Sequence, residues 1–247
     1  MLNTTLEKIV NKKLNSELIK DFTPNGLQIE GKKNIKKIVT GVTACQNLLD
    51  LAVKEKADAI IVHHGYFWNN DPRPITGILK KRIQTLLCND INLYSWHLPL
   101  DIHKKMGNNR QIANKLNIEV IGNILPILPW GRFKKKITGK ELEKKIIDTY
   151  HRIPFYYEPY KKKYIDKIAW CSGKGQKFIE NAVKFGIDAF LTGEMSEETI
   201  HFVRENQIHF FSIGHHASEI DGIKTLTKWL KKRHGLNASF FDIHNPV

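Results

Sequence analysis

Histidine and carboxylate side chains follow apolar runs at several points of the sequence, and these are residue types that bind divalent metal ions. Six residues share this placement: His63, His64, His97, Asp101, His215 and Glu219. Imidazoles and carboxylates without thiolates suit Zn, Mn, Fe, Co or Ni, and a carboxylate that can bridge two ions makes a two-metal centre reasonable. Each feature alone is more often structural, whereas their joint occurrence favours a metal site.

The spacing of these residues indicates how they could share a site. Adjacent residues of a strand point to opposite faces, so His63 and His64 could serve one metal pair only where the strand ends and the backbone turns, which Gly65 permits. His215 and Glu219 stand four residues apart in a segment with helical periodicity, and one helix face would present both. His97 is either a further ligand or a group that orients one.

Alternating apolar and helical patterns predict the sheet that positions these residues. The segment 36–44 is typical of a buried strand, 46–58 of a helix and 59–64 of a second buried strand. This order is a βαβ unit, so a parallel sheet is expected. Ligands of open α/β sheets bind beyond the carboxyl ends of the strands, where the candidate residues fall.

The sequence contains an internal repeat. Residues 166–194 align without gaps to 36–64, with identities that include Ile38 with Ile168, Gln46 with Gln176, and Asp58 with Asp188. Both copies continue into a helix and a third strand, followed by a histidine with an acid four residues on. The chain is therefore interpreted as a duplicated α/β half.

The repeat suggests where the halves begin and end. We expect a first α/β half over 1–121, with the first set of metal ligands, and a second over 166–247, with the other set. Residues 122–165 are rich in proline, lysine and tyrosine around one helical segment. They are interpreted as a connecting excursion without a core of its own.

Composition limits the class of protein. The longest apolar runs are too short to span a membrane, and the N-terminus lacks the apolar segment of a signal peptide, so a cytoplasmic protein is expected. The 3 cysteines cannot all pair. The net charge of +14 would suit a nucleic acid partner, but it comes from 32 Lys and only 7 Arg, so compositional bias is the favoured explanation.

Several motifs together resemble those of the type 2 GTP cyclohydrolase I homolog family, also known as the NIF three-like family. The similarity spans nearly the whole chain and matches short bacterial members that lack an inserted middle domain. It is carried by NGLQIEG at 25–31, TGVTA at 40–44, DAIIVHHGYFW at 58–68, INLYSWHLPLD at 91–101, AWCSGKGQ at 169–176, DAFLTGE at 188–194 and GHHASE at 214–219.

The resemblance implies a fold, an assembly and a ligand set. The fold would be two similar, intertwined three-layer α/β/α halves with mainly parallel sheets, and the assembly a homohexamer, a ring of dimers, with two divalent metal ions per chain. The implied ligands are His63, His64, Asp101, His215 and Glu219, with His97 as an additional candidate.

Two functions follow as hypotheses. The first is a dinuclear metal-dependent hydrolase that acts on a purine nucleotide or a related cyclic amide or amidine through a metal-activated water, with Glu219 bridging the ions and His97 beside them. Lys80, Lys81 and Arg82 are candidates for holding a triphosphate, although an exposed helix face is the favoured explanation for them. The alternative is a ring-shaped binding or regulatory protein, with nucleic acid as a conceivable partner and no catalysis.

Overall fold

The computed structural model describes residues 1–71 and 74–247, which divide into two compact units. The first unit combines Met1–Met106 with Ile220–His244, and the second combines Gly107–Glu219 with Asn245–Val247. Each unit is therefore built from two separate stretches of chain, as expected for intertwined halves. Among the described residues, no helix combines the length and the apolar character needed to cross a membrane.

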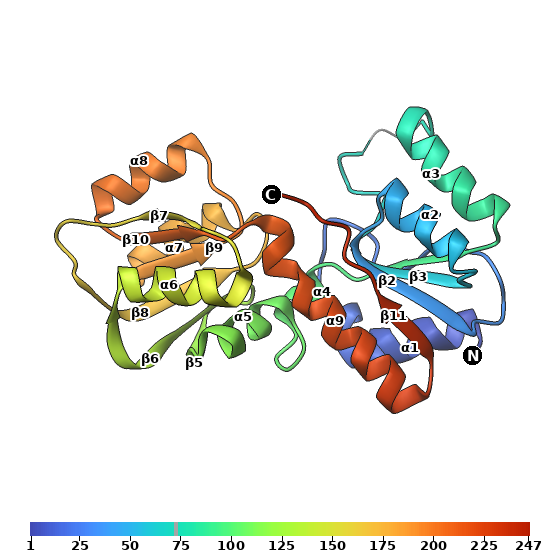
Figure 1. Ribbon diagram of the computed structural model, residues 1–247, viewed down its shortest axis with the longest axis horizontal. Coiled ribbons are helices and arrows are strands. Elements are labelled where there is room, and N and C mark those ends of the chain that lie inside the picture. The colour runs from blue at the N-terminus through green and yellow to red at the C-terminus, as the bar shows by residue number, and fades with distance from the viewer. Residues whose placement is uncertain (72–73) are drawn as a thin grey trace. The chain divides into compact units, whose positions relative to one another are not determined.

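The first unit is a five-stranded sheet between two layers of helices (Figure 1). Its strands have the order β1-β4-β3-β2-β11, and only β1 is antiparallel to its neighbour. The strands are β1 (Gly26–Ile29), β2 (Lys37–Thr43), β3 (Ala59–His64), β4 (Asn92–Ser95) and β11 (Asn237–Phe240). The helices are α1 (Asn3–Leu14), α2 (Gln46–Lys54), α3 (Gly77–Cys88), α4 (Leu98–Ile102) and most of α9 (His215–His234).

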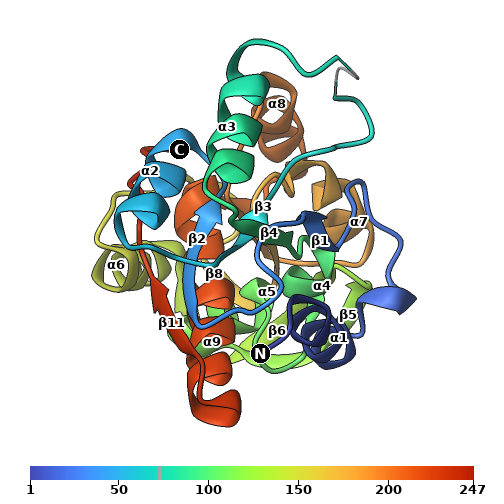
Figure 2. The same ribbon diagram turned by 90° about the vertical axis from the view of Figure 1, so that its right-hand side faces the viewer.

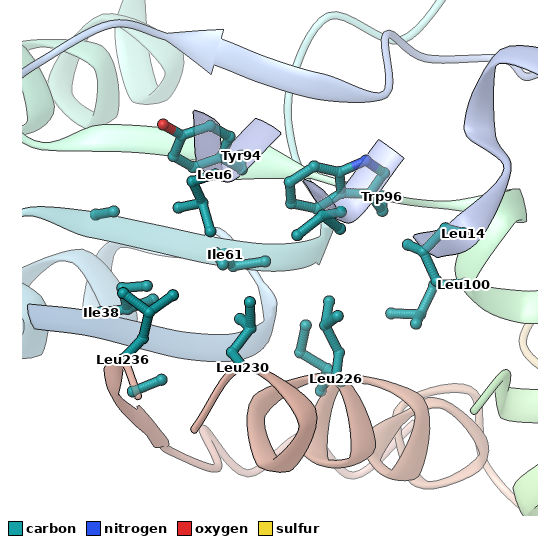
Figure 3. Packing of buried hydrophobic residues seen from close by; sticks show 14 of the residues in the cluster. Leu6, Leu14, Ile38, Ile61, Tyr94, Trp96, Leu100, Leu226, Leu230 and Leu236 are labelled. Atoms are coloured by element: carbon teal, nitrogen blue, oxygen red, sulfur yellow. The ribbon is translucent and has the colours of Figure 1, made fainter. Parts of the chain in front are cut away.

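Apolar side chains on both faces of this sheet explain why helices cover both. Helices α2 and α3 pack on one face, and α1 and α9 pack on the other (Figure 2). Figure 3 shows Leu226 and Leu230 of α9 pointing toward Ile38 of β2 and Ile61 of β3, and all four side chains are fully buried. The near-continuous apolar runs of β2 and β3 are thus typical of a parallel strand that is buried on both faces.

The second unit has the same three layers around a six-stranded sheet of order β5-β6-β8-β9-β10-β7. Strands β8, β9 and β10 are parallel, whereas the remaining neighbours are antiparallel, so only the first sheet is mainly parallel. The strands are β5 (Glu119–Leu125), β6 (Leu128–Thr138), β7 (Phe155–Tyr157), β8 (Tyr164–Cys171), β9 (Ala189–Thr192) and β10 (His209–Ser212). The helices are α5 (Asn108–Leu116), α6 (Gly139–Tyr150), α7 (Ile179–Lys184) and α8 (Glu197–Asn206).

The observed units differ from the expected division into 1–121, 122–165 and 166–247. Residues 122–165 are no separate excursion, because β6 and β7 belong to the second sheet and Leu142 and Ile146 of α6 are buried in its core. At the other end of the chain, β11 pairs in parallel with β2 of the first sheet. The sequence repeat marks the shared βαβ units, but it does not mark where the flanking segments pack.

The internal repeat is visible in the strand register. Ile38 pairs with Ala59 between β2 and β3, and the equivalent residues Ile168 and Ala189 pair between β8 and β9. The next strand of each repeat also pairs in parallel with its predecessor, β4 with β3 and β10 with β9.

A pair of aspartates repeats its contacts as well. Asp58 accepts hydrogen bonds from the backbone N–H groups at the start of β2, at 2.9 and 3.0 Å, and its other oxygen lies 3.0 Å from Lys32 Nζ. Asp188 accepts the same two bonds at the start of β8, at 3.1 and 3.0 Å, with Lys162 Nζ at 3.4 Å. Equivalent aspartates thus connect the start of the first strand of each repeat with the loop that precedes its second strand.

Candidate metal site

Three histidines of the first unit meet at the carboxyl end of its parallel strands. His63 and His64 end β3, and His97 immediately precedes α4. The ring centroid of His63 lies 4.5 Å from that of His64 and 5.1 Å from that of His97. One ring nitrogen from each residue lies within 4.8 Å of the others, so the three imidazoles could hold a metal ion.

The end of β3 explains how two adjacent histidines reach one site. The strand stops at His64, and Gly65 packs so closely that a Cβ there would overlap the Gln28 side chain and come within 2.7 Å of Ser95 Cβ. Gln28 Oε1 in turn accepts a hydrogen bond of 2.7 Å from the backbone N–H of Tyr66. The turn after His64 is therefore fixed by packing and by this hydrogen bond.

Oxygen atoms orient all three rings through Nδ1. His63 Nδ1 lies 3.0 Å from the carbonyl oxygen of Trp96, and His64 Nδ1 lies 3.0 Å from Thr43 Oγ1. His97 Nδ1 lies 2.7 Å from a carboxylate oxygen of Asp21. An oxygen partner at Nδ1 directs Nε2 toward a metal ion, which is the usual arrangement around metal-binding histidines.

Asp21 is a member of the site that the sequence analysis did not identify. Its carboxylate also accepts hydrogen bonds from the Leu98 backbone N–H, at 2.8 Å, and from Asn25 Nδ2, at 2.9 Å. Burial raises the pKa of Asp21, but hydrogen bonds and the charge of His97 outweigh it, so the pKa is lowered overall. The sequence around Asp21 carries only the turn-forming residues Pro24, Asn25 and Gly26, which give no sign of a metal site.

Asp101 completes the first cluster, which comprises His63, His64, His97 and Asp101. It lies on the short helix α4 and is 4% exposed. Its Oδ1 is 3.5 Å from Nε2 of His63, longer than a good hydrogen bond. Two ligands at roughly 2.1 Å from one tetrahedral ion lie about 3.4 Å apart, so this spacing fits a shared metal ion.

The second cluster lies in the second unit and comprises His215, Glu219 and Glu194. His215 and Glu219 lie one turn apart at the start of α9, with Nε2 of His215 3.1 Å from Oε2 of Glu219. The other ring nitrogen, Nδ1, is 2.6 Å from Glu194 Oε1. Burial lowers the pKa of His215, but hydrogen bonds and charge from Glu219 and Glu194 outweigh it and raise the pKa to about 9.

A glycine turn after β8 approaches the second cluster closely. The backbone N–H of Gly173 donates a hydrogen bond of 2.9 Å to Ser218 Oγ. With φ at +60°, Gly173 adopts a backbone conformation that favours glycine, and a Cβ there would overlap the Glu219 carboxylate and lie 3.0 Å from His215 Nε2. Only glycine leaves room for the carboxylate at this point.

The six residues expected from the sequence therefore fall into two clusters. His63, His64, His97 and Asp101 gather in the first unit, and His215 and Glu219 gather in the second. Sequence reasoning missed the two carboxylates that hold a histidine at Nδ1, Asp21 and Glu194. Glu194 lies in the quoted motif DAFLTGE, but its role was not recognised.

Comparison with known proteins places the chain in a family. The model of the Duf34/NIF3 (NGG1p interacting factor 3) family matches residues 1–246, and the chain belongs to this family. It is 59% identical over 247 residues to the GTP cyclohydrolase 1 type 2 homolog of Buchnera aphidicola subsp. Baizongia pistaciae (strain Bp), covering 100% of both chains. The protein of the same name from Escherichia coli (strain K12) is 51% identical, again over 100% of both.

A solved structure is similar to this fold over its full length. It is described as "Structural genomics, protein ybgI, unknown function" and matches with a TM-score of 0.98 at 51% identity, covering 100% of both chains. The family resemblance and the two-sheet α/β fold expected from the sequence are thus confirmed.

Proposed function

We propose that the protein is a dinuclear metal-dependent hydrolase whose ions are held by His63, His64, Asp101, His215 and Glu219, with His97 as a further ligand. The observation that carries this proposal is the orientation of the first cluster, where three imidazoles converge and each has an oxygen partner at Nδ1. Histidines with a purely structural role have no need of this shared arrangement.

The donor set fits divalent ions such as Zn, Mn, Fe, Co or Ni. When bound, such ions supply Lewis acidity and lower the pKa of water. Two carboxylates orient ligand histidines. Asp21 keeps the proton of His97 on Nδ1, and Glu194 does the same for His215, so Nε2 is the ligand atom of each ring. Glu219 is buried and could offer one oxygen to each of two ions.

The substrate we propose is a purine nucleotide or a related cyclic amide or amidine. The name of the curated relatives, GTP cyclohydrolase 1 type 2 homolog, supports this class. Hydrolysis of such a ring requires attack by water on an electrophilic carbon and protonation of the leaving nitrogen. We further propose, from the family resemblance, that the chain assembles as a homohexamer, which light scattering after size exclusion would test.

The test is formate release from GTP by the untagged protein loaded with Mn or Zn. We expect release that is lost on chelation, restored by the metal, and lost in the Asp101→Ala and Glu219→Ala variants. Asp90→Ala is the matched control, because Asp90 is an exposed carboxylate of the first unit outside both clusters. Metal binding without formate release from GTP would support the metal site and contradict GTP as the substrate. Release that persists in both cluster variants would contradict the assigned ligands.

A further inference from the structure

A pocket of about 370 Å³ opens beside the first cluster, within the first unit. Its lining begins with Gly65, directly after His64, and includes residues of the first turns of α3. The lining also includes Tyr66, Trp68, Asp71, Leu79 and Arg82. This is enough space for part of a small-molecule ligand.

Trp68 connects this pocket with the histidines. Its ring meets the His97 ring edge to face, with centroids 4.9 Å apart, and lies 6.1 Å from the His64 ring. The backbone N–H of Trp68 donates a hydrogen bond of 3.0 Å to Asp71, so that carboxylate is already engaged at the pocket wall. A ligand in the pocket would therefore lie against the same ring that contacts the first cluster.

Arg82 brings a positive charge to the pocket. Its Nε is shielded from solvent, and across residues 1–71 and 74–247 it has no hydrogen-bond acceptor and the guanidinium has no ion-pair partner. A shielded guanidinium donor without an acceptor is costly, and an oxyanion would offset that cost.

We propose that this pocket binds the phosphate of the substrate and that Arg82 is the residue that holds it. This inference rests on the proposed function, because it assigns the ligand of the same site to phosphorylated heterocycles. The planar guanidinium can donate two parallel hydrogen bonds to one phosphate, and the flat base would lie toward Trp68 and the histidines. The apolar side chain of Leu79 completes the pocket wall on α3.

The two lysines before Arg82 provide a contrast within the same helix. Lys80 and Lys81 are exposed and do not line the pocket, whereas Arg82 is half-buried and does. The basic cluster expected from the sequence thus separates into one pocket residue and two solvated charges. Exposed lysines contribute little to binding at moderate ionic strength.

Isothermal titration calorimetry of GTP, guanosine and orotate distinguishes these roles. We expect Arg82→Met to weaken GTP binding roughly 10- to 100-fold, about 1.4 to 2.8 kcal/mol, and to leave guanosine binding unchanged. Arg82→Lys, which keeps the charge but not the planar fork, should show a smaller loss, and Lys81→Met less than a 2-fold loss. Circular dichroism confirms that each variant is folded.

The titrations are made with metal-loaded and with chelator-treated protein, and bound metal is counted in each. Weaker GTP binding by Arg82→Met, with and without metal, supports the phosphate assignment even if no hydrolysis is found. Equal losses in Arg82→Met and Lys81→Met would overturn it, because they would reflect general charge. So would a larger loss for orotate, a carboxylated heterocycle without phosphate, than for GTP. Metal-loaded wild-type protein that retains no metal would contradict the proposed function, and the comparison of the variants in GTP binding would still test the phosphate assignment.

Discussion

Nε2 of His63 and Oδ1 of Asp101 lie 3.5 Å apart in a buried part of the first unit. The two residues come from different segments, the end of β3 and the helix α4. Their separation is too long for a strong hydrogen bond and fits two ligands of one metal ion.

Replacing Asp101 with asparagine should lower metal affinity without unfolding the protein. The amide has nearly the same shape, but it lacks the negative charge that attracts a divalent ion. We expect metal affinity to fall by at least ~10-fold. Competition with a chromophoric chelator measures this, with Asp90→Asn as the exposed control. Equal affinity in both variants would remove Asp101 from the ligand set.

Asp21 and Glu194 should matter to metal binding although neither is assigned as a ligand. Each carboxylate holds the Nδ1 of a histidine, at 2.7 Å for His97 and 2.6 Å for His215. Changing such a partner typically costs ~10- to 100-fold in metal affinity. We therefore expect Asp21→Asn and Glu194→Gln to weaken binding within that range in chelator competition. Asp50→Asn, on the exposed side of α2, is the control. Affinity that is unchanged in both variants would show that the histidines need no orientation.

Gly173→Ala should damage the second cluster by contact with Glu219. The matched control is Gly235→Ala, because Gly235 has nearly the same φ, +63°, and nothing lies within 4 Å of its added Cβ. Both variants lose stability through backbone strain of ~1–2 kcal/mol. Only Gly173→Ala should also reduce metal binding.

Urea unfolding gives the stability of both glycine variants, and elemental analysis gives the metal content. Metal loss of equal size in Gly173→Ala and Gly235→Ala would mean that strain alone, and not the overlap with Glu219, is responsible.

His209 should make the second unit lose more stability in mild acid than a variant without this histidine does. This residue is fully buried on β10, with Nδ1 3.0 Å from the hydroxyl of Tyr156. Burial lowers the pKa of His209, and a hydrogen bond with the Lys162 backbone and the charges of Glu158 and Asp188 oppose this only in part. Below about pH 6.5 His209 binds a proton in the unfolded chain but not in the folded one, so its contribution to stability falls as pH falls, by at most ~1.4 kcal/mol per pH unit.

His209→Asn tests this, since Asn92 occupies the equivalent place on β4. Urea unfolding at pH 7.5 and 5.5 should show a smaller loss of stability in His209→Asn than in wild-type protein. His201→Asn, an exposed histidine of α8, should behave as wild type. The same pH dependence in all three proteins would exclude His209 as the source.

The sequence predicted the repeated βαβ units because their apolar runs are continuous and the two copies align without gaps. Ile38 with Ala59 and Ile168 with Ala189 are both identical in type and equivalent in pairing. The boundaries of the two units could not be predicted in the same way. Whether β11 pairs with β2 depends on tertiary packing, which periodicity does not report.

The histidines were predictable because they follow strands, where open α/β sheets place their ligands. Asp21 was not predictable, because it lies 76 residues before His97 and the two meet only in the folded chain. Arg82 could be separated from Lys80 and Lys81 only by its burial in the pocket. Local pattern therefore identified candidate ligands, whereas their partners emerged only from the folded chain.

The most direct test of a dinuclear metal centre is the number of metal ions bound per chain. Untagged protein is loaded separately with Zn, Mn, Fe, Co and Ni, desalted and subjected to elemental analysis, beside the His63→Ala and Glu219→Ala variants. A dinuclear centre predicts about two ions per chain for at least one of these metals and a clear loss in both variants. Wild-type protein that binds none of the metals under any loading condition would contradict it.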